Sequence, residues 1–159
     1  MNLKCISLNI RGLNKAMKRR KLFRWIHISK YDVIFLQETY SDKAIENVWC
    51  AEWGGDIFYF HGSKHSRGVM TLIKPTVNVE NTNIIRDKNG RVVDVKLTIQ
   101  GEEFCLANIY APNDQNLQVD FYTQLTSMLC PYVNLNIVLG GDFNCPLENI
   151  DKKRRKRHQ

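Results

Sequence analysis

The order of apolar and polar residues predicts a chain in which short strands alternate with helices. Residues 3–8 alternate in polarity, and residues 32–37 form a short apolar run of the kind that is buried on both faces of a sheet. Further strands are expected at residues 56–60, 69–73, 77–85, 92–99, 104–110 and 136–139. Asn89-Gly90 is a strong hairpin signal between two of these strands.

Three helices are expected, at residues 16–29, 42–50 and 117–130. In the last of them apolar residues recur every four positions, which places them on one side of a helix. The elements run strand–helix–strand–helix, then a series of strands, then helix–strand. This order implies a layered α/β fold, with helices packed against sheet, in one domain that covers residues 1–151.

Composition is that of a soluble globular domain. The chain has 159 residues, of which 43% are hydrophobic and 25% charged. No apolar run is long enough to span a bilayer and no secretory signal follows Met1, so we expect a nuclear or cytoplasmic protein rather than a membrane or secreted one. The five cysteines are odd in number and include no CxxC pair, which argues against a disulfide framework or a zinc site.

Basic residues are concentrated in two places. The run 152–157 supplies six of the 23 lysines and arginines, so much of the net charge of +7 belongs to this tail. A second cluster spans residues 18–21. Such clusters attract nucleic acid through counterion release, but they also occur as solvated helix faces. We expect residues 152–159 to be a disordered tail, with a localisation signal as the alternative.

Polar residues stand directly after four of the expected strands; they are Asn9, Glu38, Tyr110, and Asp142 with Asn144. Ligands in open α/β sheets gather at strand ends. If these ends share one edge, Glu38 and Asp142 converge, and two convergent carboxylates repel unless a cation lies between them. Carboxylate and amide oxygens suit Mg²⁺ or Mn²⁺ rather than zinc, and such an ion serves phosphodiester cleavage.

Each of these residues also has an ordinary structural interpretation. Glu38 suits the acidic start of the helix at 42–50, and Tyr110 suits a partly buried aromatic. Asn9, Asp142 and Asn144 suit turns. The position of all five after apolar strands is more telling than any one of them alone.

Five segments, read together, resemble one known family. They are LNIRGL (8–13), LQET (36–39), SRGVMTLI (66–73), NIYAPN (108–113) and GGDFNC (140–145). They resemble the endonuclease/exonuclease/phosphatase superfamily, and within it the apurinic/apyrimidinic-type endonuclease domain of LINE-type non-LTR retrotransposons. The segments occur in the family's order and extend over most of the chain.

The resemblance implies a four-layer αββα sandwich and a Mg²⁺-dependent (or Mn²⁺-dependent) enzyme that nicks DNA to leave a 3′-hydroxyl primer. It implies metal ligation by Asn9, Glu38, Asp142 and Asn144, and catalysis by Tyr110, Asp142 and Asn144. We expect DNA contacts from basic and motif residues, namely Arg11, Lys18, Arg19, Arg20, Arg67 and Asn113. The implied partners are DNA and a reverse transcriptase domain in a longer parent protein, with the chain itself taken as a monomer.

The sequence departs from the family pattern in two respects. The family has a serine–aspartate–histidine motif near the end of its domain, which this sequence lacks, and His158 follows only the basic run. We therefore expect an incomplete fold and impaired activity. At position 11 some relatives carry an acid, whereas Arg11 can contact a phosphate or serve as a plain surface charge. Two alternatives follow: another phosphoesterase of the same superfamily, or a non-catalytic nucleic-acid-binding remnant.

Overall fold

The computed structural model describes residues 2–145. The strands are β1 (Cys5–Asn9), β2 (Val33–Gln37), β3 (Asp56–Phe60), β4 (Val69–Ile73), β5 (Val79–Arg86), β6 (Val92–Ile99), β7 (Glu102–Tyr110) and β8 (Asn136–Asp142). The helices are α1 (Ala16–Ile28), α2 (Glu46–Trp53) and α3 (Gln115–Leu129), with short 3-10 helices at Lys43–Ile45 and Cys130–Tyr132. The basic tail predicted at 152–159, with His158, lies outside the described residues.

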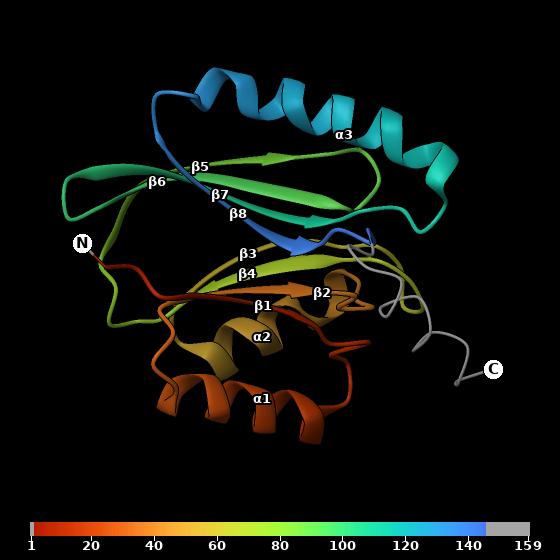
Figure 1. Ribbon diagram of the computed structural model, residues 1–159. Coiled ribbons are helices and arrows are strands. Elements are labelled where there is room, and N and C mark those ends of the chain that lie inside the picture. Colours follow the sequence, from red (N-terminus) through yellow and green to blue (C-terminus); the bar gives the residue numbers. More distant parts are fainter. Residues whose placement is uncertain (1, 146–159) are drawn as a thin grey trace.

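The elements form four layers (Figure 1). The first sheet has the order β1-β2-β4-β3 and the second the order β5-β6-β7-β8. Helices α1 and α2 cover the outer face of the first sheet, and α3 covers that of the second (Figure 1). The αββα sandwich is therefore confirmed.

Every predicted strand and helix is present, with boundaries that shift by a few residues at most. The third helix begins earlier than expected because the Asp114 side chain accepts a hydrogen bond of 2.9 Å from the backbone N–H of Asn116 and caps the first turn. The second helix continues to Trp53, whose side chain is buried together with that of Trp49. Gly54 ends it with φ +76, a conformation that costs glycine little.

Apolar side chains fill the three spaces between the layers. Because β2 lies in the middle of the fold, its alternate residues serve two of them. Val33 and Phe35 pack between the sheets, whereas Ile34 and Leu36 pack against the helices of the first sheet. A third cluster joins the second sheet to α3. The apolar run at 32–37 is thus a strand buried on both faces, as predicted.

Two pairs of parallel strands determine where polar residues meet. β1 pairs with β2 in register Asn9 to Gln37, and β7 pairs with β8 in register Tyr110 to Asp142. The carboxyl ends of all four strands lie at the same end of the sandwich (Figure 1). We call this end the rim.

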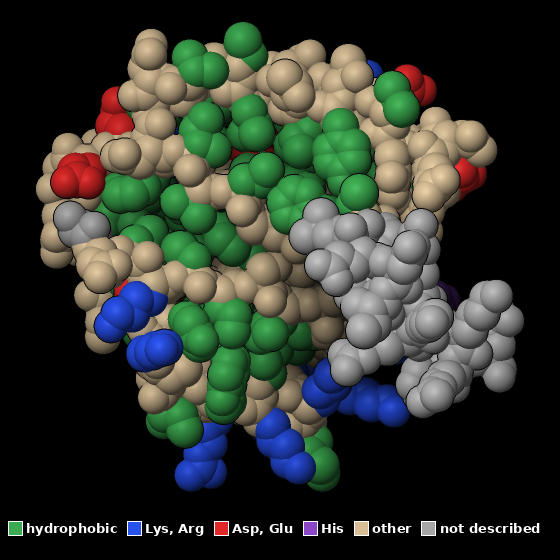
Figure 2. All heavy atoms as spheres, viewed as in Figure 1, with side chains coloured by type: hydrophobic (Ala, Val, Ile, Leu, Met, Phe, Trp, Pro, Cys, Tyr) green, Lys and Arg blue, Asp and Glu red, His purple; other side chains and the backbone are tan. Residues whose placement is uncertain are grey.

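Lysine and arginine side chains gather over α1 at the lower edge of the molecule, and apolar side chains are visible above them (Figure 2). The exposed apolar residues include Ile137 and Leu139 of β8. None of the helices in residues 2–145 is long and apolar enough to cross a membrane. All five cysteines are free thiols.

Candidate functional site at the rim

Asn9 joins the two carboxylates that the sequence singled out. Its Nδ2 atom donates one hydrogen bond of 2.9 Å to Glu38 Oε1 and another of 2.9 Å to Asp142 Oδ2. Glu38 directly follows β2 of the first sheet, whereas Asp142 is the last residue of β8 in the second. Two carboxylates from opposite sheets therefore lie against one nitrogen atom.

Two tyrosines donate hydrogen bonds to Glu38. Tyr40 donates to Oε2, and Tyr110 also donates to this carboxylate. Burial acts to raise the pKa of Glu38, but the hydrogen bonds from Asn9, Tyr40 and Tyr110, with the charge of Arg11, outweigh it and lower the pKa. Burial and the contact with Glu38 raise the pKa of both tyrosines to about 12. At neutral pH Glu38 is therefore anionic and both phenols are proton donors.

Asn144 fixes the position of Asp142. Its backbone N–H donates 3.0 Å to Asp142 Oδ1, and its side-chain Nδ2 donates 2.6 Å to the carbonyl oxygen of Ala111. Gln118 of α3 in turn donates 3.2 Å to the carbonyl oxygen of Asn144. Asp142 is thus held from two sides, through one oxygen by Asn9 and through the other by Asn144.

Strained backbone is concentrated around these residues. Five non-glycine residues near the rim have positive φ; they are Arg11 (+48), Glu38 (+55), Tyr40 (+51), Arg67 (+62) and Asn144 (+48). Such a conformation costs of order 1–3 kcal/mol for a residue with a side chain, and it persists where the surrounding structure enforces it. Strain of this kind is typical of functional sites.

A buried pair of amides links the two sheets directly behind the rim. Gln37 Nε2 donates 2.8 Å to Asn108 Oδ1, and Asn108 Nδ2 donates 2.8 Å and 3.2 Å to the carbonyl oxygens of Met70 and Leu36. Gln37 precedes Glu38, and Asn108 stands two residues before Tyr110. The link therefore determines how the two halves of the site face each other.

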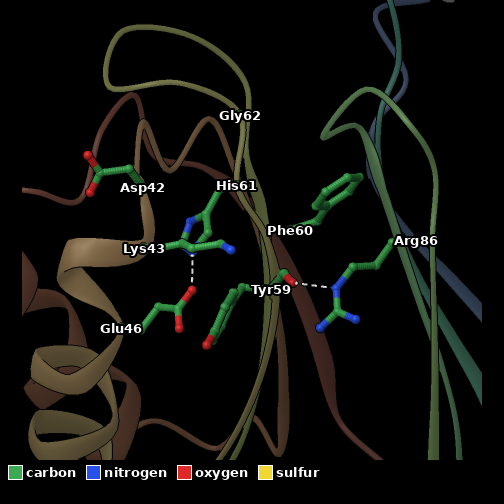
Figure 3. A pocket seen from close by; sticks show the side chains of 8 residues that line it. All are labelled: Asp42, Lys43, Glu46, Tyr59, Phe60, His61, Gly62 and Arg86. Carbon is green, nitrogen blue, oxygen red and sulfur yellow. Dashed lines mark hydrogen bonds and ion pairs between the residues drawn. The ribbon is translucent and has the colours of Figure 1, made fainter.

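A cavity of about 470 Å³ lies beside the rim, between α2 and β3 (Figure 3). His61 projects into it and contacts Glu46 at 2.8 Å through Nε2. Through Nδ1 the same ring forms a hydrogen bond of 2.9 Å with Ser41, whose hydroxyl lies 2.9 Å from that of Thr39. This chain of contacts ends at the residue after Glu38 and supports the backbone of the site from the α2 side.

The structure gives three of the predicted DNA-contacting residues different surroundings. Arg19, predicted to contact DNA, is buried, forms an ion pair of 2.6 Å with Glu52 and donates to two backbone carbonyls. Lys18 donates to the carbonyl oxygens of Ile10 and Arg11 and holds the loop after β1. Arg20 is 72% exposed beside the same Glu52.

The other three predicted contacts are exposed near the rim. Arg11 follows Asn9 closely and lowers the pKa of Glu38 through its charge. Arg67 lies on the loop before β4, and Asn113 lies between β7 and α3. All three residues are exposed, so a large ligand can reach them.

Sequence reasoning missed several residues of the site. The position of Tyr40 directly after LQET could have indicated a site residue, but nothing in the sequence shows that its hydroxyl turns back to Glu38. Gln37 and Asn108 could have been identified more easily, because each is an amide inside an otherwise apolar strand. Such residues are expected to find buried partners.

The donor atoms at the rim fit a hard divalent cation. Two carboxylates converge on one amide group, the potential ligands are carboxylate oxygens and amide oxygens, and sulfur and imidazole are not among them. Among residues 2–145 no three His, Cys, Asp or Glu side chains gather, so an ion here would have two carboxylates and complete its shell with water. Mg²⁺ commonly binds in this manner.

Comparison with known proteins agrees with the architecture. Residues 6–159 match the endonuclease/exonuclease/phosphatase family. The chain therefore belongs to that family. Its nucleases generally use divalent metal ions.

One protein sequence and several solved structures are similar to this chain. The chain is 28% identical over 97% of its length to a 149 kDa protein of transposon TX1 from Xenopus laevis, and it spans 12% of that protein. It is 22% identical, with a TM-score of 0.70, to an AP endonuclease from Archaeoglobus fulgidus, and covers 60% of it. It is 18% identical, with a TM-score of 0.73, to the 3′ phosphatase NExo from Neisseria bound to a product DNA hairpin, and covers 61% of it.

Proposed function

We propose that this chain is a metal-dependent phosphodiesterase of the retrotransposon endonuclease type, which nicks DNA and leaves a 3′-hydroxyl. The single observation that carries the proposal is the contact of Glu38 and Asp142 with one Asn9 nitrogen, beside the hydroxyl of Tyr110. The transposon relative supports the retrotransposon branch. On this proposal the partner is DNA, and a reverse transcriptase domain in a longer parent protein extends the 3′-hydroxyl.

Glu38, Asp142 and Asn9 would hold Mg²⁺ or Mn²⁺ in this proposal, with Asn144 as the further ligand that the family resemblance implies. The ion, when bound, neutralises phosphoryl oxygens and the developing charge of the leaving group. Asn9 orients both carboxylates, and the three hydrogen bonds to Glu38 keep it anionic and therefore ready to bind a cation.

Tyr110 and Asp142 are adjacent in the register of β7 and β8 and complete the chemistry. The phenol of Tyr110 stays protonated at neutral pH, so it donates a hydrogen bond or a proton to a phosphate oxygen. Asp142 accepts a proton from the attacking water or returns one to the leaving group. Asn144 keeps Asp142 in a single orientation.

For the polypeptide of residues 1–159 on its own we expect slow turnover. A positioned acid or base typically contributes about 10²- to 10⁴-fold in rate. The serine–aspartate–histidine motif that supplies one in the resembled family is not in this sequence. Nicking as fast as that of a full-length AP endonuclease would refute this expectation.

A plasmid-nicking assay tests the proposal. Supercoiled plasmid is incubated with the chain and MgCl₂, and conversion to open circles is followed over time. We expect conversion to depend on Mg²⁺ and to fall at least tenfold in Glu38→Gln. The matched control is Glu80→Gln, which removes an exposed carboxylate from the far end of β5 and should leave the rate unchanged. Nicking that is equal in wild type and Glu38→Gln contradicts the proposal.

A further inference from the structure

Two arginines, Arg67 and Arg91, line one cavity beside Tyr110 of the rim. Arg67 precedes β4 and Arg91 precedes β6. Their loops are joined by a hydrogen bond of 3.2 Å from the N–H of Gly68 to the carbonyl oxygen of Gly90, and Arg67 Nη1 donates 3.3 Å to the carbonyl oxygen of Asn89. Both arginines line the same cavity of about 210 Å³.

Arg91 is held against Tyr110. Its Nη1 donates 3.1 Å to the carbonyl oxygen of Tyr110, and its guanidinium carbon lies 5.3 Å from the centre of the tyrosine ring. This guanidinium group is half-buried and is thus fixed next to a residue of the proposed active site. It is positioned for a ligand that also touches Tyr110.

The two positive charges are not neutralised by a paired acid. Among residues 2–145 neither arginine forms an ion pair. Asp87 lies near Arg91, but its carboxylate accepts hydrogen bonds from the backbone N–H groups of Asn89, Arg91 and Val92. Burial, and then the charge of Arg67, lower the pKa of Arg91. Two like charges held together in this way favour an anion between them.

The cavity beside the arginines has room for more than an ion. Its other walls are Asn89, Pro112, Leu117, Phe121 and Gln124, which offer two amides and an apolar surface. An anion that is attached to a partly apolar group, such as a phosphate with its sugar, matches this combination of charge and surface.

We infer that Arg67 and Arg91 together bind one phosphate of the DNA strand, next to the phosphate that is cleaved at the rim. This inference rests on the proposed function and adds a path for the substrate. The strand runs from Glu38 and Asp142 across Tyr110 to the β5–β6 hairpin loop. Arg91, which sequence reasoning did not select, is then a DNA-contacting residue in its own right.

The salt dependence of DNA binding tests this inference. Binding of a fluorescein-labelled DNA duplex is measured by anisotropy in EDTA over a series of KCl concentrations, so that no cleavage occurs. Each neutralised phosphate adds about 0.9 to the slope of log K against log salt concentration for duplex DNA. We expect the double variant Arg67→Gln/Arg91→Gln to lose about 0.9, because the two side chains share one phosphate.

Other outcomes and controls make the experiment decisive. An unchanged slope in the double variant overturns the inference, and a loss of about 1.8 overturns the sharing of one phosphate. Arg91→Lys keeps the charge and should keep the slope; if it loses as much as Arg91→Gln, the effect is structural and the inference fails. Arg24→Gln removes an exposed charge from α1, away from the rim, and should keep the slope as well.

The same set of proteins separates this inference from the proposed function. Wild-type chain that nicks plasmid with Mg²⁺, together with an unchanged slope in the double variant, rejects the phosphate site alone. Wild-type chain that binds duplex with the expected slopes but shows no nicking that depends on Glu38 rejects the proposed chemistry and leaves the phosphate site supported.

Discussion

Asp94 makes folding stability depend on pH in an unusual direction. It lies on β6, between neighbours that face the core between the sheets, and so points toward α3 on the other face of the second sheet. Its side chain is 1% exposed, and neither carboxylate oxygen has a hydrogen-bond partner within the described part of the chain. Burial, and then the charge of Asp87, raise the pKa of Asp94 to about 7.

The magnitude follows from linkage between protonation and folding. In the unfolded chain an aspartate titrates near 3.9, so between about pH 4 and 7 the folded state of this group binds more protons than the unfolded state. Stability is therefore highest below pH 4 as far as this group is concerned and falls as the pH rises to about 7. A shift of about three pKa units corresponds to about 4 kcal/mol.

Asp94→Asn tests this reasoning because it keeps the shape and removes the charge. Urea unfolding is followed by the fluorescence of the buried Trp49 and Trp53 from pH 5 to pH 8. At pH 8 the substitution removes the buried charge, which should stabilise the variant relative to wild type by up to about 4 kcal/mol. The amide of the new asparagine is itself unpaired, which costs about 1–3 kcal/mol and reduces this gain. Toward pH 5 the carboxyl group of wild type becomes protonated, so the difference in free energy of unfolding between variant and wild type should shrink and can reverse in sign.

The control removes an exposed carboxylate from the helix above. Asp120→Asn on α3 should follow the wild-type dependence of stability on pH. If Asp94→Asn and wild type lose stability in parallel from pH 5 to pH 8, Asp94 is not a buried, uncompensated carboxyl and the argument fails.

Three further predictions concern other parts of the structure. Asn108→Leu breaks the link between the sheets and should lower the free energy of unfolding by about 2–3 kcal/mol in urea, because buried polar groups lose their partner; a change near zero contradicts the link. Arg19→Met should cost about 3–5 kcal/mol, whereas Arg20→Met, at an exposed position, should cost less than about 1 kcal/mol; equal losses contradict the burial of Arg19. Tyr110→Phe should slow Mg²⁺-dependent nicking about 10²-fold, and wild-type activity should persist up to about pH 10 because the pKa of Tyr110 is about 12; loss of activity near pH 8 contradicts its role as a donor.

The elements of the fold were predictable because each has a strong local pattern. Residues 33–36 are all apolar, and the chain reverses at Asn89-Gly90 between two strands as the dipeptide indicates. The residue pattern alone predicts that the polar residues at the strand ends lie along one edge of a single sheet. In the structure they come from two sheets, with Asn9 and Glu38 on one and Tyr110 and Asp142 on the other.

What could not be predicted depends on contacts between residues far apart in the chain. Arg19 belongs to a basic run, which predicts an exposed charge, but in the structure it is buried and forms an ion pair with Glu52 on α2. Nothing in the sequence distinguishes Arg91 from other residues near a hairpin, and only the structure shows that its guanidinium lies over the ring of Tyr110. Asp94 interrupts a run of valines, and only the folded structure shows that its carboxylate is buried with no hydrogen-bond partner among residues 2–145.

The central claim is that Glu38 and Asp142 bind one divalent ion jointly, and Mn²⁺ binding tests it most directly. The free Mn²⁺ signal is followed by electron paramagnetic resonance during titration of wild type, Glu38→Gln, Asp142→Asn and the double variant, with Mg²⁺ as competitor. Each single substitution should weaken binding at least tenfold, or about 1.4 kcal/mol, and the double substitution should add less than the sum of the two, since both act on the same ion. Mn²⁺ affinity that is unchanged in both single variants, or losses that add fully as at independent sites, would contradict the account.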